Sequence, residues 1–258
     1  MHTFRIAAAC ALFVCALADA GEAQYRAPRT ADGKPDLQGI WQAVNAAVYD
    51  VEDHGASLGV PAGQGVVEGG VIPYRPEALA QREKNRAARA TEDNEAKCHM
   101  VGVPRIMYMP YPFQIVQTPR QIMLMSEYVH TIRNIHLDSA HPRGPIQWYM
   151  GDSRAKWDGD TLVVDTVHFT DQTWLDRSGN FHSDALHTVE RITRTGPDHL
   201  LYEVTLEDPK TYTRPWKMSM PLYRRQEKNM QLLEYECYAY QLDTAKVSPS
   251  EVGDGNGR

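Results

Sequence analysis

Short runs in which apolar residues alternate with polar ones dominate the chain after residue 110. They are rich in Val, Ile, Thr and Tyr, and Pro, Gly, Asp and Asn separate them. This pattern is typical of strands, and the even spacing predicts an antiparallel meander that closes into a barrel or a sandwich. The predicted strands are Leu37–Val44, Phe113–Gln117, Gln121–His130, Thr131–Leu137, Gln147–Met150, Lys156–Trp157, Thr161–Phe169, Leu186–Thr195, Leu200–Glu207, Trp216–Tyr223 and Leu232–Tyr240.

One segment has a helical pattern. Pro76–Ala90 begins with a proline, which suits the first helical position, and continues with strong helix formers. Its apolar stripe is thin, so we expect one flanking helix on the outside of a sheet. We interpret its basic residues, Arg82, Lys84, Arg86 and Arg89, as a solvated face.

The N-terminus has the pattern of an export signal. Arg5 precedes the apolar run Ile6–Leu17, and Ala18–Ala20 gives an A-x-A cleavage site. The apolar run is too short to cross a bilayer as a helix. We therefore predict a signal peptide over residues 1–20, an extended leader over 21–36, a single β-barrel domain over 37–245 and a disordered tail over 246–258. The protein is expected in the periplasm or outside the cell.

The net charge limits the classes of binding partner, and the cysteine count predicts a disulfide. The formal net charge is −6 and the basic residues are scattered, so we expect neither nucleic acid binding nor membrane insertion. Removal of the signal leaves two cysteines, Cys98 and Cys237. Two thiols in an oxidising compartment usually pair, so we predict a disulfide, with two free buried thiols as the alternative. Two cysteines do not suffice for a Cys-based zinc site.

Several motifs recur together along the chain. They are PDLQGIW (35–41), PYPFQIVQTP (110–119), WDGDTLVVDT (157–166), TWLD (173–176), HSDALHTVER (182–191) and EDP (207–209). In this combination the chain resembles a large group of exported bacterial proteins of unassigned function. The resemblance implies export and a lipocalin-like (calycin-type) barrel, whose first strand carries a G-x-W such as Gly39–Trp41. It implies no particular activity.

The candidate site is the long polar connection between His168 and His187. Side chains alternate along a strand, so Glu190 and Arg191 point to opposite sides and one of them faces the interior. That charge either forms an interior salt bridge or lies at the end of a ligand cavity. His182 and Asp184 precede the strand. A histidine oriented by a carboxylate can act as a general base, although Asp184 could equally cap a turn.

A second cluster supplies candidate substrate-binding residues. On a continuous strand, Tyr128 and His130 share one face and Arg133 lies on the other. The alternative is a solvated edge strand. Trp148 belongs to a region rich in aromatic residues and methionine, which is either core or the wall of an apolar pocket.

Metal binding is the weaker expectation. Five histidines could converge in space, but no H-x-H, H-E-x-x-H or H-x₃-H spacing occurs. No G-x-S-x-G is present either, which disfavours a serine hydrolase. We therefore expect no cofactor, with a metal left as the alternative. The five histidines are His130, His136, His141, His182 and His187.

The leading hypothesis is an exported enzyme with an apolar barrel pocket. It would carry out lyase, isomerase or hydrolase chemistry on a small organic or sugar-derived ligand. His187 or His182 would move the proton, Asp184 or Glu190 would orient it, and Arg191 or Arg133 would stabilise negative charge. The alternative is a non-catalytic periplasmic protein that binds a hydrophobic ligand.

Overall fold

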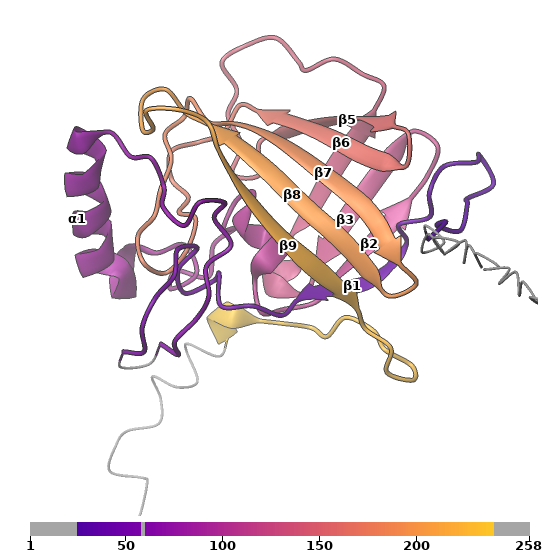
Figure 1. The fold of residues 1–258 in the computed structure, drawn as a ribbon, viewed down its shortest axis with the longest axis horizontal. Helices are drawn as coiled ribbons and strands as arrows, with labels where there is room; N and C mark the ends of the chain where they lie inside the picture. Colours follow the sequence, from indigo (N-terminus) through magenta and orange to yellow (C-terminus); the bar gives the residue numbers. More distant parts are fainter. Residues whose placement is uncertain (1–24, 58–59, 240–258) are drawn as a thin grey trace, which may run out of the picture.

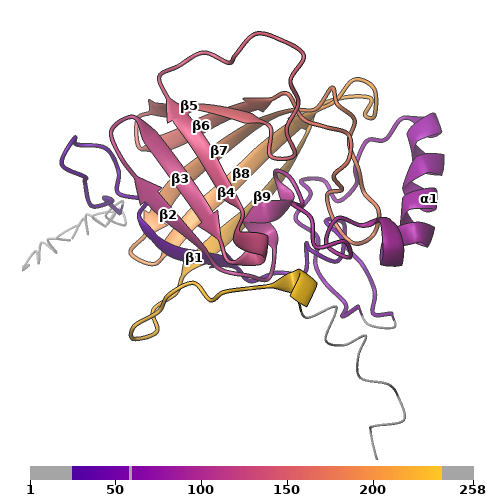
Figure 2. The same cartoon turned by 180° about the vertical axis from the view of Figure 1, so that it is seen from behind.

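The computed structural model describes residues 25–57 and 60–239, and its strands form a closed barrel (Figures 1 and 2). Neighbouring strands follow one another in sequence, and β1 closes the barrel by pairing with both β2 and β9. The predicted mainly-β, lipocalin-like barrel with a flanking helix is confirmed. The strands are β1 (Gly39–Ala43), β2 (Phe113–Gln117), β3 (Gln121–Ser126), β4 (Ile132–Leu137), β5 (Asp152–Asp158), β6 (Thr161–Val167), β7 (His187–Gly196), β8 (His199–Glu207) and β9 (Trp216–Arg224).

Alternation along the strands fills the barrel. In β6, Leu162 and Val164 are buried while Val163 between them is partly exposed, and β8 repeats this pattern. The interior is a packed core that includes Trp41 of β1 and Trp216 of β9. These buried side chains belong to one hydrophobic cluster that runs through the barrel.

The strand order contains one parallel pair, where the barrel departs from the predicted antiparallel meander. β4 pairs in parallel with β5 through Ile135–Leu137 and Ser153–Ala155. Parallel neighbours need a crossover connection, and residues 138–151 provide it. The predicted strand Gln147–Met150 lies in this connection, where Trp148 makes an isolated bridge to Phe169.

The predicted strand Gln121–His130 is also shorter than expected. β3 ends at Ser126, and a 3₁₀ turn follows, η2 (Tyr128–His130), in which Val129 has a φ of 43°. The turn interrupts the alternation, so Tyr128 is buried and His130 is exposed. The chain re-enters the barrel with Arg133 facing the interior.

One α-helix, α1 (Pro76–Glu92), lies outside the barrel, as predicted, and begins at the expected proline (Figure 1). A 3₁₀ helix, η1 (Arg105–Tyr108), follows it, and all four of its residues are buried. The Tyr108 hydroxyl donates to the Leu175 carbonyl at 2.8 Å. This contact ties η1 to the polar connection between β6 and β7.

The C-terminal segment crosses back over the molecule. The predicted disulfide is confirmed, because Cys98 and Cys237 are bonded across 139 positions of sequence. Residues 232–239 are not a strand, contrary to the prediction. Instead, Tyr235 packs against Tyr111 and Tyr128, with ring centroids 4.7 and 5.9 Å away.

The predicted signal peptide and C-terminal tail lie outside the described residues. Within the described ranges, no helix is both long and apolar enough to cross a membrane.

Candidate functional site

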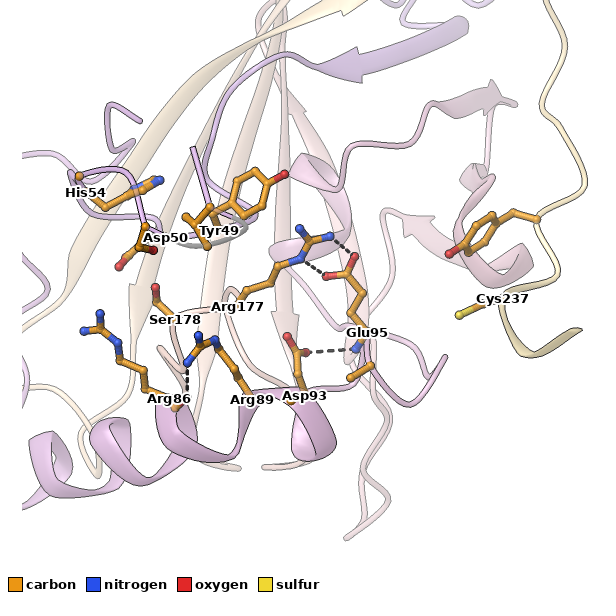
Figure 3. Close-up of a pocket in the computed structure, with 16 residues that line it drawn as sticks. Tyr49, Asp50, His54, Arg86, Arg89, Asp93, Glu95, Arg177, Ser178 and Cys237 are labelled. Carbon is orange, nitrogen blue, oxygen red and sulfur yellow. Dashed lines mark hydrogen bonds and ion pairs between the residues drawn. The ribbon is translucent and has the colours of Figure 1, made fainter. Parts of the chain in front are cut away.

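A cavity of about 900 Å³ lies on the α1 side of the molecule (Figure 3). Its walls come from α1, from residues 49–57, from Arg177 and Ser178, and from the C-terminal Tyr235 and Cys237. It is therefore built by connections outside the strands. Its volume falls within the range of small-molecule sites.

Two carboxylates lie together beside this cavity. Asn180 donates its side-chain amide to both, at 3.0 Å to Asp50 Oδ1 and 2.6 Å to Asp176 Oδ2. Asp50 lines the cavity, whereas Asp176 is fully buried behind it. Asp176 also accepts backbone N–H bonds from Val51 at 3.0 Å and from Ser178 at 2.9 Å. The pair thus joins two connections that lie more than a hundred residues apart in sequence.

The surroundings of Asp176 shift the pKa of its carboxyl group. Burial and the neighbouring charge of Asp50 raise the pKa of Asp176 to about 7, although bonds from Asn180 and Val51 oppose the shift. Two carboxylates in one site do not readily ionise together, which favours the protonated form of the buried Asp176. Asp176 can therefore bind or release a proton near neutral pH.

Close packing against α1 positions the Asp50–Asp176 pair. Gly179 has a φ of +83°, and a Cβ there would lie 2.6 Å from the backbone nitrogen of Arg86. Only glycine lets this connection approach the helix so closely. The Asn85 side chain then donates to the Gly179 carbonyl at 3.3 Å. The carboxylates are consequently held at a fixed distance from the basic residues of the helix.

Two arginines are already paired with carboxylates of the cavity wall: Arg177, which lines the cavity, and Arg105, which is buried behind it. Arg177 binds Glu95 through both ends of its guanidinium, at 2.7 and 2.5 Å, and lies over the ring of Tyr49. Arg105 is fully buried and binds Asp93 at 2.6 and 3.0 Å. Burial raises the pKa of Glu95, but the arginines outweigh burial and hold the pKa below its ordinary value.

The sequence-predicted residues do not converge on this cavity. Arg133 and Glu190 do meet, but inside the barrel, where Arg133 Nη1 donates to Glu190 Oε1 at 2.9 Å. Arg133 also donates to Ser153 and Thr166, and Tyr202 donates to Glu190 at 2.8 Å. Both charged groups are 2% exposed or less. Of the two alternatives, the geometry matches the interior salt bridge.

His187 lies on the outer face of the barrel. Its Nε2 atom is 2.9 Å from Asp165 Oδ2, and the Nε2 of His141 is 2.9 Å from the other oxygen of the same carboxylate. His141 Nδ1 lies 2.7 Å from Asp152. The partner of His187 is thus Asp165, and neither predicted carboxylate, Asp184 nor Glu190, contacts it. Both ring nitrogens of His141 therefore face a carboxylate oxygen.

The remaining predicted residues are scattered. Asp184 pairs with Lys210 at 2.6 Å, Arg191 with Asp158 at 3.1 Å and His130 with Glu236 at 2.8 Å, all exposed pairs. Tyr128 is buried in the aromatic cluster with Tyr235, and Trp148 is 37% exposed. Within residues 25–57 and 60–239, no three His, Cys, Asp or Glu side chains are arranged as metal ligands.

His182 is buried and has a fixed tautomer. Its Nδ1 lies 2.9 Å from the Ser183 carbonyl, which can only accept, so Nδ1 carries the hydrogen. Its Nε2 then accepts from the Thr173 hydroxyl at 2.8 Å. Burial lowers the pKa of His182. The ring is therefore neutral and has no free nitrogen for a substrate.

This burial predicts a dependence of stability on pH. Unfolded His182 binds a proton near its ordinary pKa of about 6.5, whereas the folded form resists protonation until lower pH. The contribution of His182 to the unfolding free energy should therefore fall as pH falls below 6.5, by at most about 1.4 kcal/mol per pH unit. Urea unfolding of the wild type and of His182→Gln between pH 7.5 and 5.5 measures it. The difference in unfolding free energy between the wild type and His182→Gln should become smaller as the pH falls. A difference that stays constant would contradict the prediction.

The sequence interpretation missed the cavity residues. The sequence interpretation places the basic side chains of α1 on a solvated face and gives Asp176 no functional role beyond its place in the TWLD motif. One signal was present, because Arg82, Arg86 and Arg89 are spaced to share one face of a helix. Arg82 binds Glu52 at 2.9 Å, and Arg86 and Arg89 line the cavity.

Comparison with protein-family models, curated proteins and solved structures finds no match to this chain. The resemblance drawn from sequence motifs therefore stays a prediction, and the side chains alone support a function.

Proposed function

We propose that this chain is an exported enzyme that uses acid–base chemistry, without an organic cofactor, on a small organic molecule bound in the cavity beside α1. The observation that carries the proposal is the buried Asp176, whose pKa is raised to about 7 and which shares the Asn180 amide with Asp50 of the cavity wall. A general acid–base catalyst needs a pKa close to the working pH. Lyase, isomerase and hydrolase chemistry all use such a group.

The residues have distinct roles in this proposal. Asp50 lines the cavity, so it is the group that exchanges a proton with the substrate. Asp176 is buried and bonded to the backbone, so it acts as a positioning residue that holds Asp50 in place through the shared Asn180 amide. Arg86 and Arg89 also line the cavity, where a guanidinium stabilises negative charge that develops during the reaction.

Export rests on the N-terminal pattern and is supported by the Cys98–Cys237 disulfide, because oxidising compartments maintain such bonds. The alternative is a binding protein without catalysis. A purely hydrophobic ligand fits this cavity poorly, because Asp50, Arg86 and Arg89 would lose water without gaining a partner.

Substitution of Asp50 by asparagine tests the proposal. Asparagine retains the oxygen that accepts from Glu52 N at 3.0 Å and from Asn180, so the fold should persist. Turnover should fall by about 10²- to 10⁴-fold, the usual share of acid–base catalysis. Turnover would be measured by NMR on a panel of small carboxylic acids, sugar acids and their esters. The reactions followed are exchange of carbon-bound hydrogen in D₂O, elimination and ester cleavage.

Two further variants sharpen the result. Asp158→Asn changes an exposed carboxylate remote from the cavity and should retain full turnover. His187→Gln tests the outer His–Asp cluster as the rival site. If Asp50→Asn folds and retains activity while His187→Gln loses it, the active site lies on the outer face and our assignment to the cavity fails. Wild-type turnover should also rise with pH through about 7, following deprotonation of Asp176.

A further inference from the structure

The charged groups of the cavity divide into those that are paired and those that are available. Arg177 and Arg105 are bonded to Glu95 and Asp93. The guanidinium of Arg86, by contrast, has no hydrogen bond or ion pair within the described part of the chain. Arg89 donates one bond, to the carbonyl of Arg86 at 3.0 Å. Figure 3 shows Arg86 and Arg89 rising from α1 toward Asp50 and Ser178.

Two arginines that bind no carboxylate among the described residues lie in one wall of the cavity, and together they favour binding of an anionic ligand. Arg86 and Arg89 are three positions apart on α1, where like charges repel each other. A bound carboxylate would remove this repulsion, and the planar fork of a guanidinium matches a carboxylate with two parallel bonds. The cavity is large for a simple inorganic ion. The anionic group is therefore expected on a larger organic ligand.

The other residues of the cavity wall are suited to binding the hydroxyl groups of a ligand. Asp50 presents a carboxylate, which accepts hydrogen bonds, and the Ser178 side chain lies beside it (Figure 3). His54 fixes its Nδ1 on the Glu52 carbonyl at 3.0 Å and leaves a buried Nε2 without a partner among the described residues. Tyr49 and Tyr235 add ring surfaces that can contact C–H groups. Such a wall binds a ligand that carries several hydroxyls on a carbon skeleton.

We infer that the cavity binds a polyhydroxy carboxylate, a sugar acid, with its carboxylate on Arg86 and Arg89 and its hydroxyls toward Asp50, Ser178 and His54. This inference rests on the proposed function, because it names the substrate class of the same cavity. It explains why cations and an acceptor carboxylate face one another across the space. The carboxylate gives orientation, and the hydroxyl nearest Asp50 marks the position where a proton would be exchanged.

Calorimetric titration of the full mature protein tests the inference without requiring turnover. The probes are D-galacturonate, D-glucuronate and D-gluconate, each compared with neutral D-galactose and D-glucose and with inorganic sulfate. At least one sugar acid should bind about tenfold or more tightly than the neutral sugars and sulfate. Equal affinity for sulfate would reduce the site to a general anion site, and tighter binding of the neutral sugars would exclude the arginine contact. Either result overturns the inference, as does the absence of binding by all three sugar acids.

Variants on the same helix locate the contact. The double variant Arg86→Gln with Arg89→Gln should weaken sugar-acid binding about tenfold or more. Lys84→Gln removes an exposed charge from α1 outside the cavity lining and should leave affinity unchanged. Unchanged affinity in the double variant would overturn the inference. Asp50→Asn separates the two proposals, because it should retain carboxylate binding while turnover is lost. If sugar acids bind but Asp50→Asn does not affect turnover, the function fails while the ligand class stands.

Discussion

Replacing Glu190 with glutamine is expected to destabilise the protein by about 3–5 kcal/mol, the usual cost of leaving one buried charge without its partner. Arg133 would remain in the barrel interior with only the hydroxyls of Ser153 and Thr166 and a neutral amide to contact. Tyr202 would also lose the charged acceptor of its 2.8 Å bond. Guanidinium chloride unfolding, monitored by tryptophan fluorescence, measures the loss.

Matched variants separate the ion pair from other effects. Glu203→Gln changes a carboxylate that β8 presents outward, next to Tyr202, and should alter stability by less than about 0.5 kcal/mol. Arg133→Met combined with Glu190→Leu replaces both charges with apolar groups, and it should recover much of the stability lost in the single variant. A small effect of Glu190→Gln alone would contradict the buried pair.

Removal of the disulfide is expected to cost about 2–5 kcal/mol. The bond joins Cys98 to Cys237 across 139 positions, and chain entropy alone assigns such a loop about 5 kcal/mol. The variant Cys98→Ser with Cys237→Ser should unfold at lower denaturant than the oxidised wild type. Wild type treated with reductant should match it, because the same covalent link is missing.

The part of the chain that loses protection distinguishes the effect of the disulfide from a general loss of packing. Ala78→Gly is a useful comparison, because it weakens α1 and leaves the bond intact. Hydrogen exchange should show increased exposure of residues 231–239 in the cysteine variant only. Equal stability of oxidised and reduced wild type would refute the prediction.

Local pattern was sufficient to predict most of the barrel. Alternation predicted that either Glu190 or Arg191 faces the interior, and Glu190 does. The proline at position 76 located the start of α1, and cysteine counting located the disulfide. Each of these three predictions depends on residues that are neighbours in the sequence or, for the disulfide, on a pair of cysteines that has only each other to bond with.

The cavity could not be predicted in the same way. Asp50 and Asn180 lie 130 positions apart, and each is unremarkable within its own connection. Their pairing depends on how two irregular segments pack on α1, for which there is no periodic signal. The 3₁₀ turn at Tyr128–His130 defeated the strand prediction for a related reason. Two consecutive residues with positive φ, Val129 and His130, change which side chains face the core. The sequence gives little sign of this, because valine rarely adopts positive φ.

Closure of the barrel also limits how this protein can associate. Because β1 pairs with β9 on one side and β2 on the other, each strand of the described barrel has a neighbour on both sides. An extended peptide or a second copy therefore finds no edge strand in this barrel along which to extend the sheet. Recognition at the barrel wall has to proceed through side chains, which leaves the irregular connections as the natural place for specificity to vary.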